Sequence, residues 1–359
     1  MNEMVELTKQ QRAIVEATEP HIVVVATAAA GKTRCITERV RWLLNNGVPG
    51  HEIVTITFTN AAAEEISERL GNPTGVFIGT IHALANFYLK SAGIDTSRVL
   101  NDEKFDDLFK LIKKNPDCVQ HVSYLIVDEA QDSNPQQFEF LLDMIAPDNY
   151  MLMGDHRQSI YRFNGATPEY ILSLMESPEV TTYELNENYR NAPEILDFAK
   201  GIIRTLGKDY EDHSYPMRRE AGRIVDTTYS GEGIATTIAR YVDQGKCIYK
   251  DWFILTRTNA ESEAIMQVLA RHKIPYDTFK RAQLDNKGLK EKMHENTVKV
   301  LTIHTAKGLE ADNVVVIGAR NRDVEEKCVS YVAATRARKL LVWARKPLSK
   351  KPKAEYWGG

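Results

Sequence analysis

The sequence predicts two α/β domains, each built on a parallel sheet. Short apolar runs rich in β-branched residues alternate with stretches of helical spacing, which is the pattern of strands covered by helices on both faces. A Gly-Lys-Thr tripeptide follows the first of these runs, and an Asp-Glu pair ends a later one. At 359 residues the chain exceeds one average domain, which also favours two.

The first domain is expected to cover residues 1–184. Its expected strands share continuous apolar sequence, and they are 21–28, 52–59, 75–83, 124–130 and 149–155. Helical spacing between them predicts helices at 33–46 and 60–70. The segment from about 88 to 121 lacks strong periodicity.

The second domain is expected at 185–345, without a phosphate loop of its own. The expected strands are 251–256, 298–304, 313–318 and 339–344, and the expected helices are 262–272 and 329–338. Segment 277–297 lacks periodicity. The basic, Pro-containing end, 346–359, is expected to be a flexible tail.

Composition excludes several classes of protein. With 43% hydrophobic residues, 26% charged residues and a net charge of −3, the chain resembles ordinary soluble proteins, and bulk charge alone does not indicate a nucleic-acid partner. The cysteines are widely spaced and form no CxxC pair, which argues against a zinc site or a disulfide framework and fits a reducing compartment. The polar start is unlike a signal peptide, and no apolar run is long enough to span a membrane. We therefore expect a cytoplasmic protein without a membrane partner.

The segment ATAAAGKT (26–33) predicts a phosphate-binding loop between a strand and a helix. Backbone N–H groups and a helix N-terminus would face the phosphates of ATP, Lys32 would reach the β- and γ-phosphates, and the Thr33 hydroxyl would hold Mg²⁺. Ala26 stands where the first glycine of the pattern is expected, so the loop is glycine-poor and less free in its backbone angles. The residues expected to hold the nucleotide are Ala28, Ala29, Ala30, Gly31, Lys32 and Thr33.

Asp128 and Glu129 end the apolar run YLIV, so both should face the crevice at the carboxyl ends of the strands. One carboxylate at such a place can bind magnesium, and its neighbour can act as general base on the attacking water. We assign Asp128 to the metal and Glu129 to catalysis. The cofactors predicted are therefore ATP and Mg²⁺.

The segment DEAQD (128–132) makes the resemblance specific: the sequence resembles superfamily 1 helicases of the UvrD/Rep/PcrA type over most of its length. The segments that resemble motifs of this family stand in the family's order: LTKQQRAIV (7–15), TFTNAAAEE (57–65), GTIHA (79–83), GDHRQSIYRFNGA (154–166), ENYR (187–190), TIHTAKGLE (302–310) and YVAATRAR (331–338). The resemblance implies two RecA-like parallel-sheet motor domains with the ATP site in the cleft between them.

The resemblance also implies roles at the nucleotide. Gln11 would read the adenine, Tyr189 would stack on it with Arg34 nearby, and Glu310 would contact the ribose. Gln158 would sense the γ-phosphate and position water. Arg190 and Arg336 would act as arginine fingers beside Lys32, supplying positive charge to the transferring phosphoryl group when the domains close.

A track for single-stranded nucleic acid needs aromatic platforms and groups that contact the backbone. Within the matching motifs, the aromatic candidates are Phe58, His82, Tyr161 and Phe163, and the candidates for phosphate contacts are Asn60, Thr80, Thr302 and His304. Phe163 stands where the family usually has tryptophan, and Asn164 replaces a common arginine. Stacking does not distinguish DNA from RNA, but the resemblance implies DNA.

Full-size relatives carry a large accessory insertion in each motor domain. Between GTIHA and the strand at 124–130 this insertion is reduced to a few helices at most, at about 88–121, and the second insertion, expected before 298–304, is missing. Because these insertions contact duplex in the family, translocation is expected to survive better than strand separation. A wedge that separates the two strands of the duplex could come from segment 88–121 or from a partner protein.

The sequence leaves three functions to compare. The favoured one is an ATP-dependent motor that moves 3′ to 5′ on single-stranded DNA, acts at junctions with duplex, and works with a replication or repair protein. The alternative is an adaptor that binds DNA or a protein partner in a nucleotide-dependent way and unwinds little. An unrelated phosphate-loop kinase or GTPase is disfavoured by the motifs of the second domain and by the lack of a guanine-reading NKxD-type motif. The pathway stays open.

Overall fold

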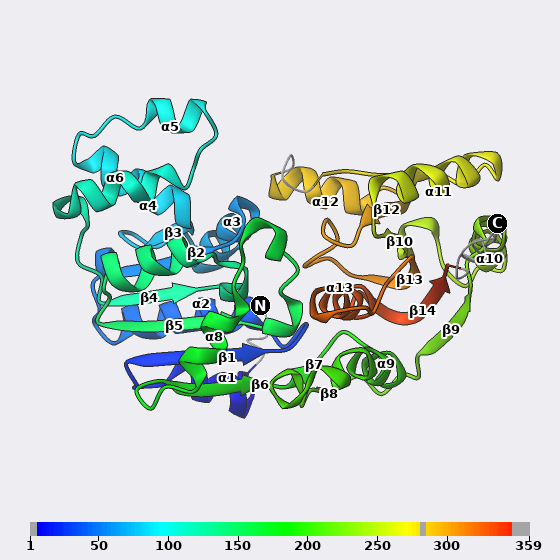
Figure 1. Ribbon diagram of the computed structural model, residues 1–359. Coiled ribbons are helices and arrows are strands. Elements are labelled where there is room, and N and C mark those ends of the chain that lie inside the picture. Colours follow the sequence, from blue (N-terminus) through cyan, green and yellow to red (C-terminus); the bar gives the residue numbers. More distant parts are fainter. Residues whose placement is uncertain (1–5, 281–284, 347–359) are drawn as a thin grey trace, which may run out of the picture.

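The computed structural model describes residues 6–280 and 285–346. Two lobes lie side by side, and each contains one six-stranded sheet in which all pairings are parallel (Figure 1). The predicted fold class, two parallel α/β domains, is confirmed. Most of the expected tail, 346–359, lies outside the described residues.

The first sheet has the order β3-β2-β4-β5-β1-β6. Its strands are β1 (His21–Ala26), β2 (Ile53–Thr57), β3 (Phe77–Thr80), β4 (Tyr124–Val127), β5 (Asn149–Gly154) and β6 (Thr181–Leu185). Alternate side chains of β1 enter opposite cores, with Ile22 and Val24 in one and Val23 in the other. The carboxyl ends of these strands face the second lobe (Figure 1).

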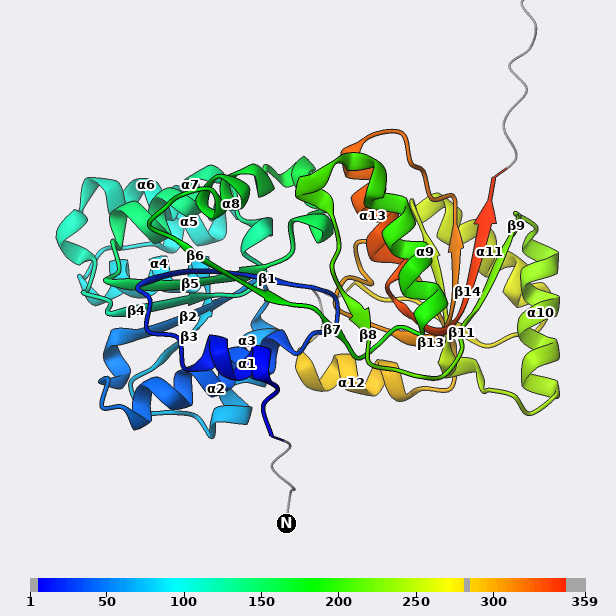
Figure 2. The ribbon, with the colours of Figure 1, turned by 90° about the horizontal axis from the view of Figure 1, so that it is seen from below.

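Helices cover both faces of the first sheet (Figure 2). One face carries α1 (Lys9–Val15), α2 (Lys32–Asn45) and α3 (Asn60–Leu70). The other carries α4 (Ile81–Ser91), α5 (Ser97–Asn101), α6 (Asp107–Lys114), α7 (Pro135–Phe138), which continues as a π-helix, and α8 (Pro168–Met175). Segment 88–121 thus contains the end of α4 and two short helices, α5 and α6.

The second sheet has the order β11-β12-β10-β13-β14-β9. Its strands are β9 (Arg223–Thr228), β10 (Trp252–Thr256), β11 (Tyr276–Asp277), β12 (Val298–Thr302), β13 (Ala311–Ile317) and β14 (Ala337–Arg345). Helices α9 (Pro193–Ile203) and α13 (Val324–Ala334) cover one face, and α10 (Gly231–Asp243) and α11 (Asn259–Arg271) cover the other (Figure 2). A small pair, β7 (Glu187–Asn188) and β8 (Tyr215–Pro216), lies between the lobes.

Several elements differ from expectation. The expected strand 75–83 ends at Thr80, because the Thr80 side chain accepts a hydrogen bond from the Ala83 N–H and caps α4 there. The expected helix 329–338 ends at Ala334, and β14 begins at Ala337. Strands β6 and β9 were not expected. Both lie at sheet edges with partly exposed, polar sequences, so they lack the apolar run that identified the central strands.

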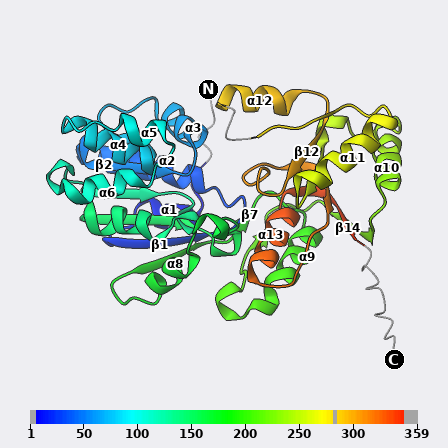
Figure 3. The same cartoon turned by 45° about the horizontal axis from the view of Figure 1, so that its top comes forward.

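Segment 277–297 lacks strong periodicity in its sequence, yet it contains α12 (Asn286–His294). Figure 3 shows this helix extending from the second lobe toward α3, which it contacts. Leu289 packs into the core of the second lobe, and Met293 packs against it. The helix therefore bridges the opening between the lobes.

Candidate functional site

The phosphate loop joins β1 to α2 and ends at Gly31, whose φ is 87°. The positive φ favours glycine here, and a Cβ at this position would lie 2.8 Å from Nε2 of Gln11, so that the Gln11 amide would have to move. Ala29 also lies in the left-handed region, with a φ of 57°. Because α2 begins at Lys32, its unpaired N–H groups open onto the loop. The loop thus retains an anion-binding shape despite its alanines.

Lys32 lies against Glu129. Its Nζ is 2.5 Å from Oε1 of that carboxylate, while the Gln131 amide donates to Oε2 at 2.5 Å. Burial alone would raise the pKa of Glu129, but Lys32 and Lys307 outweigh it and hold that pKa well below its usual range. Glu129 is therefore ionised and able to accept a hydrogen bond.

The two residues expected to hold magnesium line the same pocket. Thr33 and Asp128 line a pocket of about 410 Å³ between the lobes. Burial, together with Glu129, raises the pKa of Asp128 to about 6. Burial likewise raises the pKa of Asp132 to about 6, and Oδ1 of Asp132 is buried without a hydrogen-bond partner in the described part of the chain.

This donor set fits magnesium held jointly with a substrate. Mg²⁺ prefers hard oxygen ligands and commonly uses one or two carboxylates together with phosphates of the bound nucleotide. Among the residues described, no cluster of three or more His, Cys, Asp or Glu side chains could hold a metal by itself. A hydroxyl and a carboxylate, as Thr33 and Asp128 supply, are consistent with such a shared site.

Gln158 is held on both sides. Its Nε2 donates to Oδ2 of Asp155 at 2.8 Å, and its Oε1 accepts from Arg336 at 3.4 Å. The Asp155 N–H donates to the Gln131 side chain at 3.0 Å, which ties this turn to the DEAQD segment. A Cβ on Gly154 would lie 2.2 Å from Oε1 of Gln131, so the close approach of the two segments depends on that glycine.

The two expected arginine fingers, Arg190 and Arg336, both come from beyond β6. Arg336 is 1% exposed and donates to the carbonyls of Val332 and Leu309 as well as to Gln158. Burial, together with the neighbouring Arg190, lowers the pKa of Arg336 to about 9. Arg190 forms an ion pair with Glu310.

The residues expected near the base lie around the loop. Gln11 is buried, and its amide donates to the Ala30 carbonyl at 3.5 Å. Tyr189 is 42% exposed, and its hydroxyl donates to Glu187 at 2.9 Å. Burial and that contact raise the pKa of Tyr189 to about 12, while the nearby charge of Arg34 acts in the opposite direction. Tyr189 thus offers an accessible ring at the edge of the site.

Glu310, expected at the ribose, is partly buried. Burial would raise its pKa, but the adjacent Arg190 outweighs this and lowers the pKa. Arg338 lies 3.8 Å from its other oxygen. In this arrangement Glu310 holds Arg190.

Lys307 was missed by the sequence reasoning, although it lies within the quoted TIHTAKGLE segment. It is 7% exposed and enters the first lobe's site from the second. Its Nζ forms an ion pair with Asp132, lies 3.7 Å from Oε2 of Glu129, and donates to the Gln158 carbonyl at 3.1 Å. This lysine connects the second lobe directly to Glu129.

Asn188 was also missed, within ENYR. It is fully buried, and its amide donates to the Ala28 carbonyl of the phosphate loop at 3.0 Å and to Asn191 at 2.9 Å. The Tyr189 N–H donates to the Ala29 carbonyl at 3.4 Å. These contacts hold the strained, alanine-rich loop from outside.

Four expected track residues converge in one aromatic cluster: Phe58, Tyr161, Phe163 and His304. The rings of Phe58 and Tyr161 stack at 5.1 Å, and Phe163 meets His304 edge to face at 5.4 Å. Phe163 is 64% exposed and Phe58 47%, so both present open ring faces. Burial lowers the pKa of His304, whose ring nitrogen contacts the Ile160 carbonyl at 3.2 Å.

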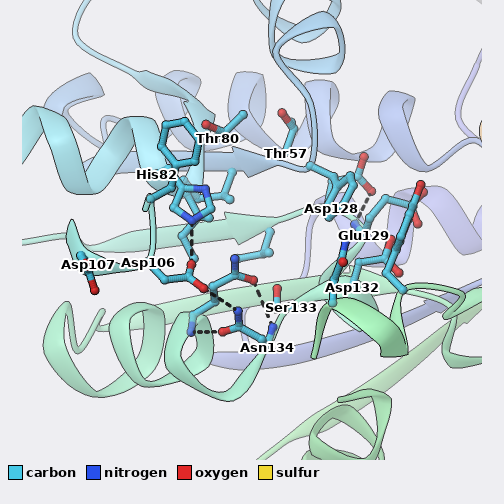
Figure 4. A pocket seen from close by; sticks show the side chains of 18 of the residues that line it. Thr57, Thr80, His82, Asp106, Asp107, Asp128, Glu129, Asp132, Ser133 and Asn134 are labelled. Atoms are coloured by element: carbon cyan, nitrogen blue, oxygen red, sulfur yellow. Dashed lines mark hydrogen bonds and ion pairs between the residues drawn. The ribbon is translucent and has the colours of Figure 1, made fainter. Parts of the chain in front are cut away.

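A cleft of about 950 Å³ begins beside this cluster (Figure 4). Asp128, Glu129 and Asp132 lie at one end, and His82 with Asp106 lies at the other. The His82 ring contacts the Asp106 carboxylate at 2.9 Å. The sequence reasoning missed the α5–α6 side of this cleft.

That side comes from segment 88–121. Phe105 is 42% exposed, lines the cleft and lies 5.7 Å from the His82 ring. Asp106 also accepts a hydrogen bond from Asn134. The segment had no periodicity to draw attention to these residues, so only the structure identifies them.

The other expected phosphate contacts lie at the ends of elements. Asn60 is exposed at the start of α3. Thr80 lines the cleft while it caps α4. The Thr302 hydroxyl lies 2.9 Å from that of Thr305 in the turn after β12.

A family model described as an AAA domain matches residues 10–164, and one described as the UvrD-like helicase C-terminal domain matches 183–284 and 278–345. The chain is 26% identical to a putative ATP-dependent DNA helicase, YjcD, of Bacillus subtilis, over 77% of this chain and 49% of that protein. It is 26% identical to the ATP-dependent DNA helicase PcrA of Leuconostoc citreum, over 75% and 49%, respectively.

The chain belongs to the UvrD/PcrA-type family of superfamily 1 helicases. Its two parallel-sheet lobes are accordingly RecA-like domains. The chain spans about half the length of the relatives that it matches. None of the described helices is both long and apolar enough to cross a membrane.

Proposed function

We propose that this protein is an ATP-driven motor that moves 3′ to 5′ on single-stranded DNA and unwinds duplex at single-strand/duplex junctions. ATP hydrolysis with Mg²⁺ would drive closure of the two lobes. Relatives that bear the name ATP-dependent DNA helicase support this proposal, as do the residues gathered around the cleft.

One observation carries the proposal. The turn after β12 contacts both the ATP site and the aromatic cluster: Lys307 reaches Glu129 and Asp132, and His304, three residues earlier, packs against Tyr161 and Phe163. A movement of this turn would therefore change both places at once. Coupling of this kind is what a nucleic-acid motor requires.

At the ATP site, Lys32 would leave Glu129 for the β- and γ-phosphates. Glu129 would then lose its closest cation, and its pKa would rise toward the range of a general base. It would accept a proton from the water that attacks the γ-phosphorus, while Gln158 holds that water in line. A Mg²⁺ ion held by Thr33 and Asp128 would supply charge stabilisation to the phosphates when bound.

Arg336 already contacts Gln158 and would stabilise the charge that develops on the phosphoryl group. Arg190 would join it after release from Glu310. Both arginines come from the second lobe, so hydrolysis would depend on closure. This dependence would make each turnover report on the relative position of the lobes.

On the other side of the turn, the exposed rings of Phe58 and Phe163 would stack on unpaired bases. Bases in duplex are already stacked and paired, so such platforms favour a single strand. Thr80, Asn60, Thr302 and His304 would contact the phosphates. Separation of the duplex would fall to the small α5–α6 segment, which forms one wall of the cleft, or to a replication or repair protein.

The decisive experiment is steady-state ATP hydrolysis with magnesium, measured alone and with single-stranded DNA, single-stranded RNA or blunt duplex. Of these three nucleic acids, we expect only single-stranded DNA to stimulate ATP turnover strongly. Slow turnover that no nucleic acid stimulates would overturn the motor and favour a nucleotide-dependent adaptor. Displacement of streptavidin from the 5′ rather than the 3′ end of a biotinylated strand would then test the proposed direction.

A further inference from the structure

A buried polar junction joins the lobes beside the γ-phosphate residues. On the first lobe it is the 3₁₀ turn His156–Gln158, and on the second it is the loop 207–214 that follows α9. A His156 ring nitrogen contacts the Asp209 carbonyl at 2.6 Å, and NH1 of Arg157 donates to the Glu211 carbonyl at 2.9 Å. His156 and Arg157 lie within the GDHRQSIYRFNGA segment, but neither is among the residues expected at the nucleotide or the track.

Arg157 lies at the centre of this junction and is 2% exposed. Its Nε donates to Oδ1 of Asp155 at 2.6 Å, and its NH1 lies 3.3 Å from Oδ1 of Asp212. Both carboxylate side chains are fully buried. The Tyr331 hydroxyl, on α13, donates to the second oxygen of Asp212 at 2.8 Å.

Stability alone is a weak reason for this arrangement. Burying three charges carries a large desolvation cost, and apolar residues of similar volume often serve stability as well or better. The NH2 group of Arg157 is also buried without a hydrogen-bond partner among the residues described. A buried ionic network with an unsatisfied donor therefore calls for another explanation.

The network closes on the hydrolytic machinery. Oδ2 of Asp155 accepts a hydrogen bond from Nε2 of Gln158, and the side-chain Oε1 of Gln158 accepts one from Arg336. Arg336 in turn donates to the Val332 carbonyl, next to Tyr331 on α13. The network thus contacts α13 at two points, through the Tyr331 hydroxyl and through Arg336.

We propose that Arg157 is a positioning residue for ATP hydrolysis, which fixes the Asp155 carboxylate, and through it the Gln158 amide, to the helix that precedes Arg336. The planar guanidinium suits this task because it offers several donors in a rigid fork, and a lysine ammonium cannot replace that geometry. This inference rests on the proposed ATPase function. It adds that the orientation of Gln158 is set from both lobes.

The test compares Arg157→Lys with Arg39→Lys. Arg39 is a matched control because it is also a buried arginine of the first lobe, 4% exposed, and it holds the carbonyls of Val15 and Ala17 at 2.8 and 2.7 Å. For each purified variant we would measure the melting temperature, and the kcat and KM for ATP with saturating single-stranded DNA, corrected for the folded fraction.

We expect Arg157→Lys to lower kcat by about 10- to 100-fold, because a displaced catalytic group loses rate steeply, with KM for ATP within about twofold. Arg39→Lys should lower the melting temperature and leave kcat per folded molecule unchanged. In a Gln158→Ala background, Arg157→Lys should cause no further loss of kcat, because residues that act as a unit are not additive.

Equal kcat for the parent protein and Arg157→Lys would overturn the inference, as would additive losses in the Gln158→Ala background. If Arg157→Lys does not fold, Tyr331→Phe replaces it, with an expected loss in kcat of about threefold to tenfold. An unchanged kcat in that variant overturns the inference too. A parent protein without turnover would instead refute the proposed function itself.

Discussion

At the residue scale, Glu129 is the side chain on which hydrolysis should depend most. Replacing it by glutamine keeps the shape and the contact with Gln131 but removes the ability to accept a proton. We expect Glu129→Gln to reduce ATP turnover by at least about 100-fold. Binding of a fluorescent ATP analogue should persist, because the phosphate loop and Lys32 remain.

A matched control for this variant is Glu65→Gln. Glu65 also lines the pocket between the lobes, but its carboxylate pairs with Arg69 on the surface of α3. Turnover should be unchanged in this variant. Substantial turnover in Glu129→Gln would remove Glu129 from the role of general base and direct attention to Asp132.

Residue-level prediction from sequence is possible where a motif constrains spacing. The neighbours of the phosphate loop and of DEAQD could be named because a strand end and a helix start fix where those side chains point. Lys307 could not be recognised in the same way, because the contacts that it makes depend on how closely the two lobes approach each other. Phe105 and Asp106 were missed because they lie in a segment without periodicity.

At the element scale, burial decides what a sequence reveals. The central strand β10 is buried along its whole length, and its apolar run identifies it. The edge strand β9 has the sequence RIVDTT with mostly exposed side chains, and nothing in that composition separates it from a loop. Helix α12 is polar on most of its surface, so its apolar contacts were too few to show a period.

The N-terminus of α11 offers a test of local stability. The Thr258 side chain accepts from the Glu261 N–H at 3.3 Å, and Glu261 accepts from the Thr258 N–H at 3.0 Å, which forms a capping box. We expect Thr258→Ala to lower the free energy of unfolding by about 1 kcal/mol. Urea unfolding would measure it, with the exposed Thr227→Ala as a control that should change little.

The α5–α6 segment should take part in binding the single strand. Phe105→Ala removes an exposed ring that lines the cleft, and base stacking on such a ring contributes roughly 1–3 kcal/mol. We expect a corresponding loss of affinity for a fluorescent single-stranded oligonucleotide, measured by anisotropy, with ATP turnover in the absence of DNA unchanged.

The control is Phe87→Ala. Phe87 is 43% exposed, against 42% for Phe105, but it lies on α4 beside Phe77 rather than along the cleft. Its removal should leave affinity for the oligonucleotide intact. Equal affinities for the two variants would exclude the α5–α6 segment from the track, and an unaffected Phe58→Ala would question the track as a whole.

At the scale of the whole molecule, contacts between the lobes are concentrated at the site. The turn 302–308 contacts Glu129 and the aromatic cluster, and Asn188 holds the phosphate loop. The loop 207–214 encloses the turn that carries Gln158. Sequence motifs predicted the two lobes and most of these segments, but not which side chains join them, because such contacts depend on tertiary placement alone.

If the turn 302–308 transmits the signal, removing Lys307 should separate the two activities. We expect Lys307→Ala to retain binding of ATP and of single-stranded DNA when each is measured alone. Stimulation of turnover by DNA should fall by about 5- to 150-fold, because typical coupling free energies between two sites correspond to factors of this size. Lys339→Ala is the control, because Lys339 pairs with Asp312 on the surface of the second lobe. Full stimulation in Lys307→Ala would mean that closure is communicated elsewhere, with the junction around Arg157 as the remaining route.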